Sequence, residues 1–90
     1  MNKKIKAKWL KALRSGKFKQ GKDQLRLGNR FCCLGVLCEI QRGDYDGDKG
    51  TPPVKLRAGL SQGQMNILID ANDLHDWSFP QIADYVEVML

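Results

Sequence analysis

The segment that most constrains the fold is Phe31–Ile40, FCCLGVLCEI, in which Glu39 is the only charged residue. On a helical projection its apolar side chains cover nearly the whole circumference, and a helix that is apolar all round belongs at the centre of a domain. We therefore predict a core helix over residues 33–42, ended by Gly43. Gly35 costs this helix about 1 kcal/mol relative to alanine, so we expect another element to pack closely against it.

The first residues predict an amphipathic helix with a strongly basic outer face. Ile5, Trp9 and Leu13 recur at helical spacing and form one apolar stripe, while most of the neighbouring lysines lie off that stripe. Ser15–Gly16 is a typical helix stop. The position of Trp9 on the stripe favours packing in the core over contact with a ligand.

The rest of the chain predicts short elements. The turn signal LGNR at 27–30 favours a β-hairpin. Its extended segments are expected at 17–20, 24–27 and 30–32. Ser61 and Ser78 are each followed three residues later by glutamine, which is the capping-box pattern of a helix start. The expected elements are a basic helix over 1–16, a hairpin over 17–32, the core helix over 33–42, a loop over 43–60 and a helical hairpin over 61–90.

These elements predict an α+β fold in which about four short helices surround a small β-hairpin. Ninety residues make one compact domain at most, because domains typically run about 100–150 residues. No run approaches the roughly 20 apolar residues of a membrane span, and lysines interrupt the apolar core that a secretory signal needs. We therefore expect a cytoplasmic protein that has no contact with a membrane.

Three cysteines within seven residues indicate a reducing compartment rather than a disulfide framework. Cys32, Cys33 and Cys38 lack the second pair of ligands that a structural zinc site needs, and His75 lies 37 residues further on. Packing in the core is therefore the preferred interpretation. The Asp44–Lys55 segment begins like a calcium loop but lacks its terminal glutamate. We expect no metal, no cofactor and, with one histidine and scattered carboxylates, no catalytic site.

Charge is divided unevenly along the chain. Residues 1–30 hold eleven Lys and Arg and one acid, a net charge of +10, whereas residues 31–90 hold four bases and nine acids, a net charge of −5. Since these parts must touch in so small a fold, we expect part of the basic charge to be neutralised internally. The remainder predicts a local anion site after the first helix, where a glycine lets the backbone approach a phosphate. The predicted ligand-binding residues are Lys17, Lys19, Gln20, Lys22, Arg26 and Arg30, with Trp9 as a candidate for stacking on a base.

Several motifs occur in an order that is typical of a known family. Trp9–Gly16 (WLKALRSG) is followed by Gln20–Gly21, by Cys32–Cys38 (CCLGVLC), and near the end by Asn72–Asp73 and Ser78–Asp84 (SFPQIAD). In this pattern the chain resembles the small uncharacterised proteins of tailed bacteriophages and prophages. The resemblance covers both ends and the core. It implies a virus-encoded accessory protein in a bacterial cytoplasm and brings no established activity.

Two functions of different kinds follow. The leading hypothesis is a binding protein for host takeover or counter-defence that holds a phosphate-bearing ligand, either a nucleotide signal or a nucleic-acid backbone, at the basic site. The alternative is a protein–protein inhibitor that docks on a host enzyme or regulator through its acidic C-terminal helical hairpin, with Asp73, Asp84 and Glu87 supplying the charge. A homo-oligomer seeded by Trp77 or Tyr85 is a further hypothesis, because a small core gains most from a partner.

Overall fold

The helix α2 (Cys33–Ile40) is the element around which the others are arranged. Every residue from Cys33 to Cys38 is buried. The helix packs against α1 (Lys3–Arg14), against α3 (Gln62–Asp73) and against the strand that precedes it. The prediction of a core helix is confirmed, because side chains that are apolar on every side need cover on every side.

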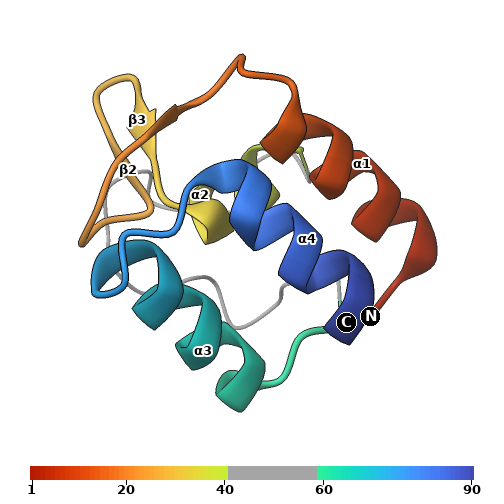
Figure 1. Cartoon of the computed structure of the whole chain (residues 1–90). Coiled ribbons are helices and arrows are strands. Elements are labelled where there is room, and N and C mark those ends of the chain that lie inside the picture. The colour runs from red at the N-terminus through yellow and green to blue at the C-terminus, as the bar shows by residue number, and fades with distance from the viewer. Residues whose placement is uncertain (41–58) are drawn as a thin grey trace.

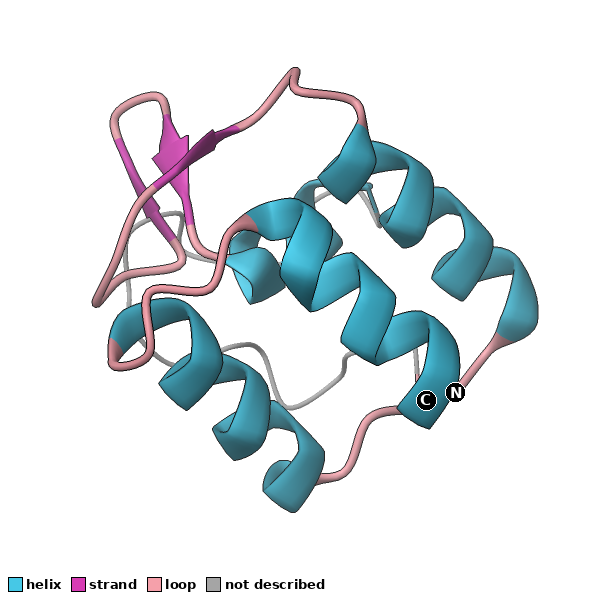
Figure 2. Ribbon diagram, viewed as in Figure 1, coloured by secondary structure: helices cyan, strands magenta, loops and turns pink. Residues whose placement is uncertain are grey.

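The computed structural model describes residues 1–40 and 59–90. A fourth helix, α4 (Phe79–Met89), lies between α1 and α3, and α2 runs behind it (Figure 1). Four helices and one small sheet make up the described residues, so the predicted α+β class is confirmed (Figure 2). None of these helices is long and apolar enough to span a membrane.

The molecule measures 29 × 26 × 24 Å along its principal axes, as expected of one compact domain. Three of the predictions fall on residues that the structure does not describe. They are the end of the core helix at 41–42, all but the last two residues of the loop over 43–60, and the Asp44–Lys55 segment.

The sheet has three strands in the order β1-β3-β2. β2 (Arg26–Leu27) and β3 (Arg30–Phe31) form the predicted hairpin, and Gly28 in its turn has the positive φ of 62° that a two-residue loop favours. β1 (Lys19–Gln20) departs from the prediction, because it pairs with β3 in parallel and makes a third strand beside the hairpin. Strands of two residues carry too little alternation to predict their partner or direction.

Gly35 lets the chain before β2 lie directly on α2. A Cβ atom added at Gly35 would overlap the carbonyl oxygen of Leu25 and lie 2.7 Å from its carbonyl carbon. The same oxygen accepts a hydrogen bond from the amide of Cys32 at 3.2 Å, which holds it in place. The expected close approach at Gly35 is confirmed, and the neighbour is backbone rather than a side chain.

Trp9 joins α1 to α2. The indole ring is buried, and its Nε1 donates a hydrogen bond to the carbonyl oxygen of Cys33 at 3.0 Å. Leu13, one turn further on, is buried as well. At the start of the helix, the side chain of Asn2 accepts a hydrogen bond from the amide of Ile5 at 3.0 Å and caps it. The predicted apolar stripe therefore faces the core.

The helices α3 and α4 begin at the predicted capping boxes. The hydroxyl of Ser61 accepts from the amide of Gln64 at 3.1 Å, and the side chain of Gln64 accepts from the amide of Ser61 at 2.9 Å. Ser78 and Gln81 form the same reciprocal pair at 3.4 and 2.9 Å. Both helix starts are confirmed, because these bonds satisfy amides that have no partner inside the helix.

We expect Gly35→Ala to destabilise the protein by about 1–3 kcal/mol, because the new methyl group overlaps a backbone carbonyl group that is held in place. At an open helix position alanine instead brings a gain of up to about 1 kcal/mol. Gly63→Ala is the matched control, since a Cβ atom there meets only the Ser61 hydroxyl, at 3.9 Å. Urea unfolding of both variants checks this, and equal effects of the two substitutions would contradict it.

Candidate anion-binding site

Trp9 is not available to a ligand. Its exposed fraction is 0%, and its one polar atom donates to the carbonyl oxygen of Cys33. The favoured interpretation of Trp9, packing in the core, is therefore confirmed, and the alternative that it stacks on a base is wrong. The physical reason is its place on the apolar stripe of α1, where burial of a large aromatic ring stabilises the fold and the indole N–H still finds a partner.

The amide of Gln20 is occupied within the protein. Its Nε2 donates to Asn72 Oδ1 at 2.9 Å and to the carbonyl oxygen of Trp77 at 2.6 Å. Asn72 is fully buried, and its Nδ2 donates to the carbonyl oxygen of Gly21 at 2.8 Å and to Asp73 at 2.7 Å. We name this group the polar clamp. Since the clamp joins β1 to the end of α3, Gln20 has a structural role in place of the predicted ligand contact.

Two of the predicted cations also have partners within the chain. Lys22 Nζ forms an ion pair with Asp76. Arg26 donates from Nε to the carbonyl oxygen of Gly28 at 2.9 Å, and its guanidinium carbon lies 5.4 Å from the centroid of the Phe31 ring, within range of a cation–π contact. Both side chains are exposed, but different parts of the chain engage their head groups. The predicted residues between 17 and 30 therefore do not form one constellation.

The sheet does bring Lys19 and Arg30 together. They lie opposite one another in the parallel register of β1 and β3, so both side chains project from the same face of the sheet. Both are exposed, and neither forms an ion pair within residues 1–40 and 59–90. This pair adds positive charge to the outer face of the sheet.

A hollow where the chain leaves α1 gathers three lysines. It has a volume of about 250 Å³ and is lined by Lys8, Lys11, Ala12, Ser15, Lys17 and Phe18. We name it the lysine hollow. Lys8, Lys11 and Ser15 follow one another at intervals of three and four residues, hence on one side of the helix. Gly16, with a positive φ of 75°, ends the helix and turns the chain so that Lys17 and Phe18 come back alongside it.

The three lysines of the hollow have no acidic partner in the part of the chain that the structure describes. The negative end of the α1 dipole opposes an anion at this point, but it amounts to only about half a charge. Moreover, Ser15 donates to the carbonyl oxygen of Ala12 from both its amide and its hydroxyl, which satisfies one of the terminal carbonyl groups. The positive charge of three ammonium groups therefore dominates the hollow.

Lys8 and Lys11 are not among the predicted ligand residues, although a sequence signal for them exists. Their spacing of three residues places them on one side of α1, close to the stop at Gly16. The spacing does not predict that Lys17 lies beside them, because its position depends on how the chain leaves the helix towards β1.

On the side of α1 that faces α4, the expected internal neutralisation of charge is present. Arg14 binds Glu87 at 3.2 Å and Asp84 at 2.8 Å, and these two hydrogen bonds raise the pKa of Arg14. Lys6 Nζ donates to the carbonyl oxygen of Glu87 at 3.0 Å, near the end of α4. These contacts hold the basic helix against the acidic one. Arg14 and Lys6 therefore have partners on α4, unlike the three lysines of the hollow.

The three cysteines are buried, which confirms that they pack in the core. Burial raises the pKa of Cys32 and Cys33 and raises that of Cys38 to about 12. The thiol of Cys33 donates to the carbonyl oxygen of Leu68 at 3.6 Å. Within the described residues, no group of three or more His, Cys, Asp or Glu side chains is placed to hold a metal ion.

The part of the chain that builds the lysine hollow also matches a protein family. Residues 1–54, which include α1, the sheet and α2, match the domain of unknown function DUF8296. The chain belongs to this family. No curated protein and no solved structure matches the chain. The DUF8296 match covers all of the lysine hollow and the Gln20 side of the polar clamp, whereas Asn72 lies in the C-terminal part beyond the match.

We expect Asn72→Ala to destabilise the protein by about 2–4 kcal/mol, because it removes a fully buried side chain and leaves the partly buried carbonyl oxygen of Gly21 and one donor of Gln20 without partners. Asn66→Ala is the matched control. Asn66 is exposed and accepts only from Gln62 on the same helix, so we expect a change below about 0.5 kcal/mol. Chemical denaturation measures both, and a similar small change for both variants would show that the clamp adds nothing to stability.

The raised pKa values of the thiols predict slow modification of the folded protein. At pH 8 the folded cysteines stay protonated, and only a thiolate reacts quickly. With Ellman's reagent we expect the native protein to react about a hundredfold more slowly than the urea-unfolded protein. Ala7→Cys, at an exposed position of α1, is the control and should add one fast thiol.

The same thiols predict a pH dependence of stability. Since the unfolded thiols ionise near pH 9 and the folded ones do not, the free energy of unfolding, measured in urea, should fall as the pH rises above about 9.

Proposed function

We propose that this DUF8296 protein is a non-enzymatic binding protein that holds a phosphate-bearing ligand in the lysine hollow. One observation carries the proposal. Lys8, Lys11 and Lys17 surround a single hollow with no acidic partner among the described residues, whereas Arg14 and Lys22 nearby are paired with acids. Three ammonium groups around one concavity repel one another until an anion binds, so an anion relieves a repulsion that the free protein retains.

The hollow suits a nucleic-acid strand better than an enclosed nucleotide. Its volume of about 250 Å³ is below the roughly 300–1,000 Å³ of sites that enclose a small molecule. A strand needs a basic track instead, and Lys4, Lys8 and Lys11 supply one at positions i, i+4 and i+7 of α1, about 10 Å long. Lysine binds a phosphate as a point charge and needs no fixed geometry. A nucleotide signal remains the alternative ligand for the same site.

Phe18 supplies the aromatic surface that the buried Trp9 does not. Its ring is partly exposed and lines the lysine hollow. It is held edge to face against Phe31, with ring centroids 5.2 Å apart and an interplanar angle of 88°. A base next to a bound phosphate can stack on such a fixed ring, and stacking of this kind tolerates any base. The favoured ligand is therefore a single-stranded nucleic acid bound with little sequence preference.

The resemblance to small proteins of tailed bacteriophages supports a setting for this activity. In the cytoplasm of an infected bacterium, a protein that covers or sequesters single-stranded nucleic acid would serve host takeover or counter-defence. The binding site itself is proposed from the charge and shape of the hollow, and it does not depend on that setting.

Fluorescence anisotropy with a short labelled oligothymidylate tests the proposal. We expect affinity to fall with salt at a log–log slope of about −3, from the four lysines of the track and the hollow, which each contribute about 0.7. The double variant Lys11→Gln/Lys17→Gln should bind about tenfold more weakly and lose about 1.4 from the slope. Lys19→Gln/Arg30→Gln removes the same charge from the face of the sheet and is the matched control, with an expected loss of about threefold or less.

Two results would overturn the proposal. One is a lack of binding at low salt to the oligonucleotide, to nucleotides and to inorganic polyphosphate. The other is an equal loss in the two double variants, which would show that net charge rather than the hollow attracts the ligand. Phe18→Leu separates the ligand classes, because it should weaken binding of the oligonucleotide and leave that of polyphosphate, which has no base to stack, unchanged. Tighter binding of a nucleotide than of the oligonucleotide would assign the hollow to a nucleotide signal.

A further inference from the structure

The outer face of α4 carries an open apolar groove that phosphate binding does not use. The groove has a volume of about 550 Å³ and is lined by Trp77, Gln81, Asp84, Tyr85, Val88 and Met89. We name it the α4 groove. Val88 is 79% exposed and Met89 is 61% exposed, and both lie beside an aromatic pair. Large apolar side chains that gather on one exposed face mark an interaction site, unlike single exposed residues.

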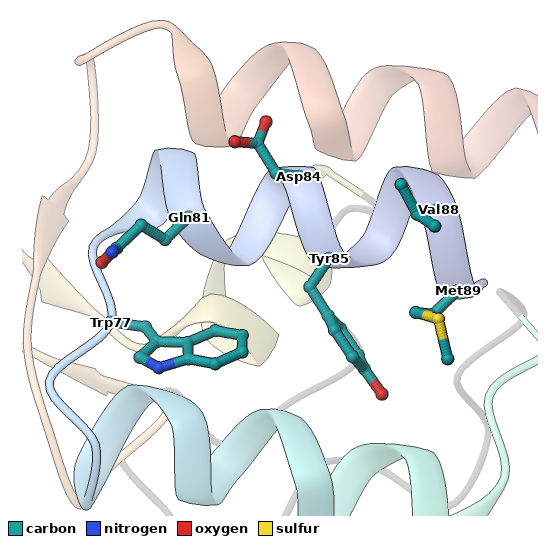
Figure 3. A pocket seen from close by; sticks show the side chains of 6 residues that line it. All are labelled: Trp77, Gln81, Asp84, Tyr85, Val88 and Met89. Atoms are coloured by element: carbon teal, nitrogen blue, oxygen red, sulfur yellow. The ribbon is translucent and has the colours of Figure 1, made fainter.

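The groove has two distinct sides. Figure 3 shows Tyr85 pointing from α4 towards α3 and the ring of Trp77, from the loop before α4, lying between the same two helices, while Asp84 and Val88 lie on the side of α1. The rings of Trp77 and Tyr85 meet at 66° with centroids 5.9 Å apart, so they support each other as one wall. The first side is therefore aromatic, and the second combines an aliphatic side chain with a carboxylate.

The length of the groove matches a short amphipathic helix. It follows α4 from Gln81 to Met89, which is about 12 Å or two helical turns. A helix that lays its apolar face into a groove presents anchor residues at i, i+3 or i+4, and i+7, which covers a similar length. Two or three large apolar side chains of such a helix would cover Tyr85 and Val88.

The charge around the groove selects a basic partner. Asp84 lines the groove, Glu87 precedes Val88 on the same helix, and residues 59–90 contain no lysine or arginine. Arg14 binds only one oxygen of Asp84 and one of Glu87, and both carboxylates are more than half exposed. Their second oxygens accept no hydrogen bond within the part of the chain that the structure describes. Since a carboxylate accepts several hydrogen bonds, lysine or arginine side chains of a partner can bind there.

We propose that the α4 groove binds an amphipathic helix of a partner protein, with its apolar anchors against Tyr85 and Val88 and its lysine or arginine side chains against Asp84 and Glu87. A second copy of the chain fits this chemistry poorly. The open face of α4 is apolar but acidic, whereas α1 is basic but buries its apolar stripe, so neither surface offers both features. The α4 groove shares no residue with the lysine hollow, so the two proposals are independent.

A designed helical peptide of leucine and lysine, with leucines at i, i+4 and i+7, is the probe. A leucine and glutamate peptide of the same pattern is its charge control. We expect the leucine–lysine peptide to bind the full chain about tenfold or more tightly than the control, as measured by fluorescence anisotropy. Val88→Lys should weaken that binding about tenfold, because it removes an anchor contact and adds a repelling charge. Leu74→Lys makes the same change in charge outside the groove, at a residue that is 71% exposed. It should lower the affinity for the leucine–lysine peptide about threefold or less.

Val88 is exposed, so Val88→Lys should keep the melting temperature of the parent protein, and its effect on binding can be assigned to the groove. Three results would each overturn the proposal. The two lysine variants could weaken binding equally, which would place the peptide elsewhere. The glutamate peptide could bind the Lys11→Gln/Lys17→Gln variant, in which the lysine hollow is weakened, as tightly as the lysine peptide does, which would exclude selection by charge. Light scattering could show that the protein alone is a dimer that Val88→Lys dissociates, which would make a second copy the occupant.

Discussion

The contact of the Leu25 carbonyl group with α2 at Gly35 is the constraint on which the other arrangements depend. Because α2 carries no side chain at this point, the chain before β2 lies directly on the helix, and Leu25 itself becomes part of the core. This position of β2 fixes β3 through antiparallel pairing, and β3 then places β1. β1 in turn brings Gln20 to Asn72 at the end of α3. In a domain with so small a core, one close approach of backbone to helix therefore orients the sheet and a second helix together.

The packing of α1 against α4 divides the basic charge into two kinds. Arg14 and Lys6 serve the fold, since they bind the acids and a terminal carbonyl oxygen of α4. Lys8, Lys11 and Lys17 lie around the lysine hollow and have no such partner among the described residues. A net charge of +5 does not distinguish these roles. Whether an acidic side chain lies opposite a basic residue decides which of the two roles that residue has.

The lysine hollow and the α4 groove are opposite in chemistry and separate in the chain. The hollow is basic, belongs to the part that matches DUF8296, and is suited to an anion. The groove is apolar with an acidic edge, lies beyond the matched residues, and is suited to a basic helix. The two surfaces share no lining residue. In the proposed binding of a partner helix, the acidic helical hairpin supplies apolar side chains as well as carboxylates. Asp73 is not part of that surface, because it accepts a hydrogen bond from Asn72 in the polar clamp.

The helices and the capping boxes of α3 and α4 could be predicted from the sequence, because each depends on residues within one or two turns of each other. A close approach at Gly35 followed from the cost of glycine in a helix, but that its neighbour is the Leu25 carbonyl group did not, since this contact is tertiary. The burial of the cysteines followed in the same way from a helix that is apolar on every side. The parallel pairing of β1 could not be predicted, since two-residue strands carry no periodicity. Of the lysine hollow, Lys17 was predicted but Lys8 and Lys11 were not, because a lysine is free for a ligand only where no acid reaches it. That condition depends on contacts between residues about 70 positions apart, such as Arg14 with Asp84 and Glu87, which exist only once the chain has folded.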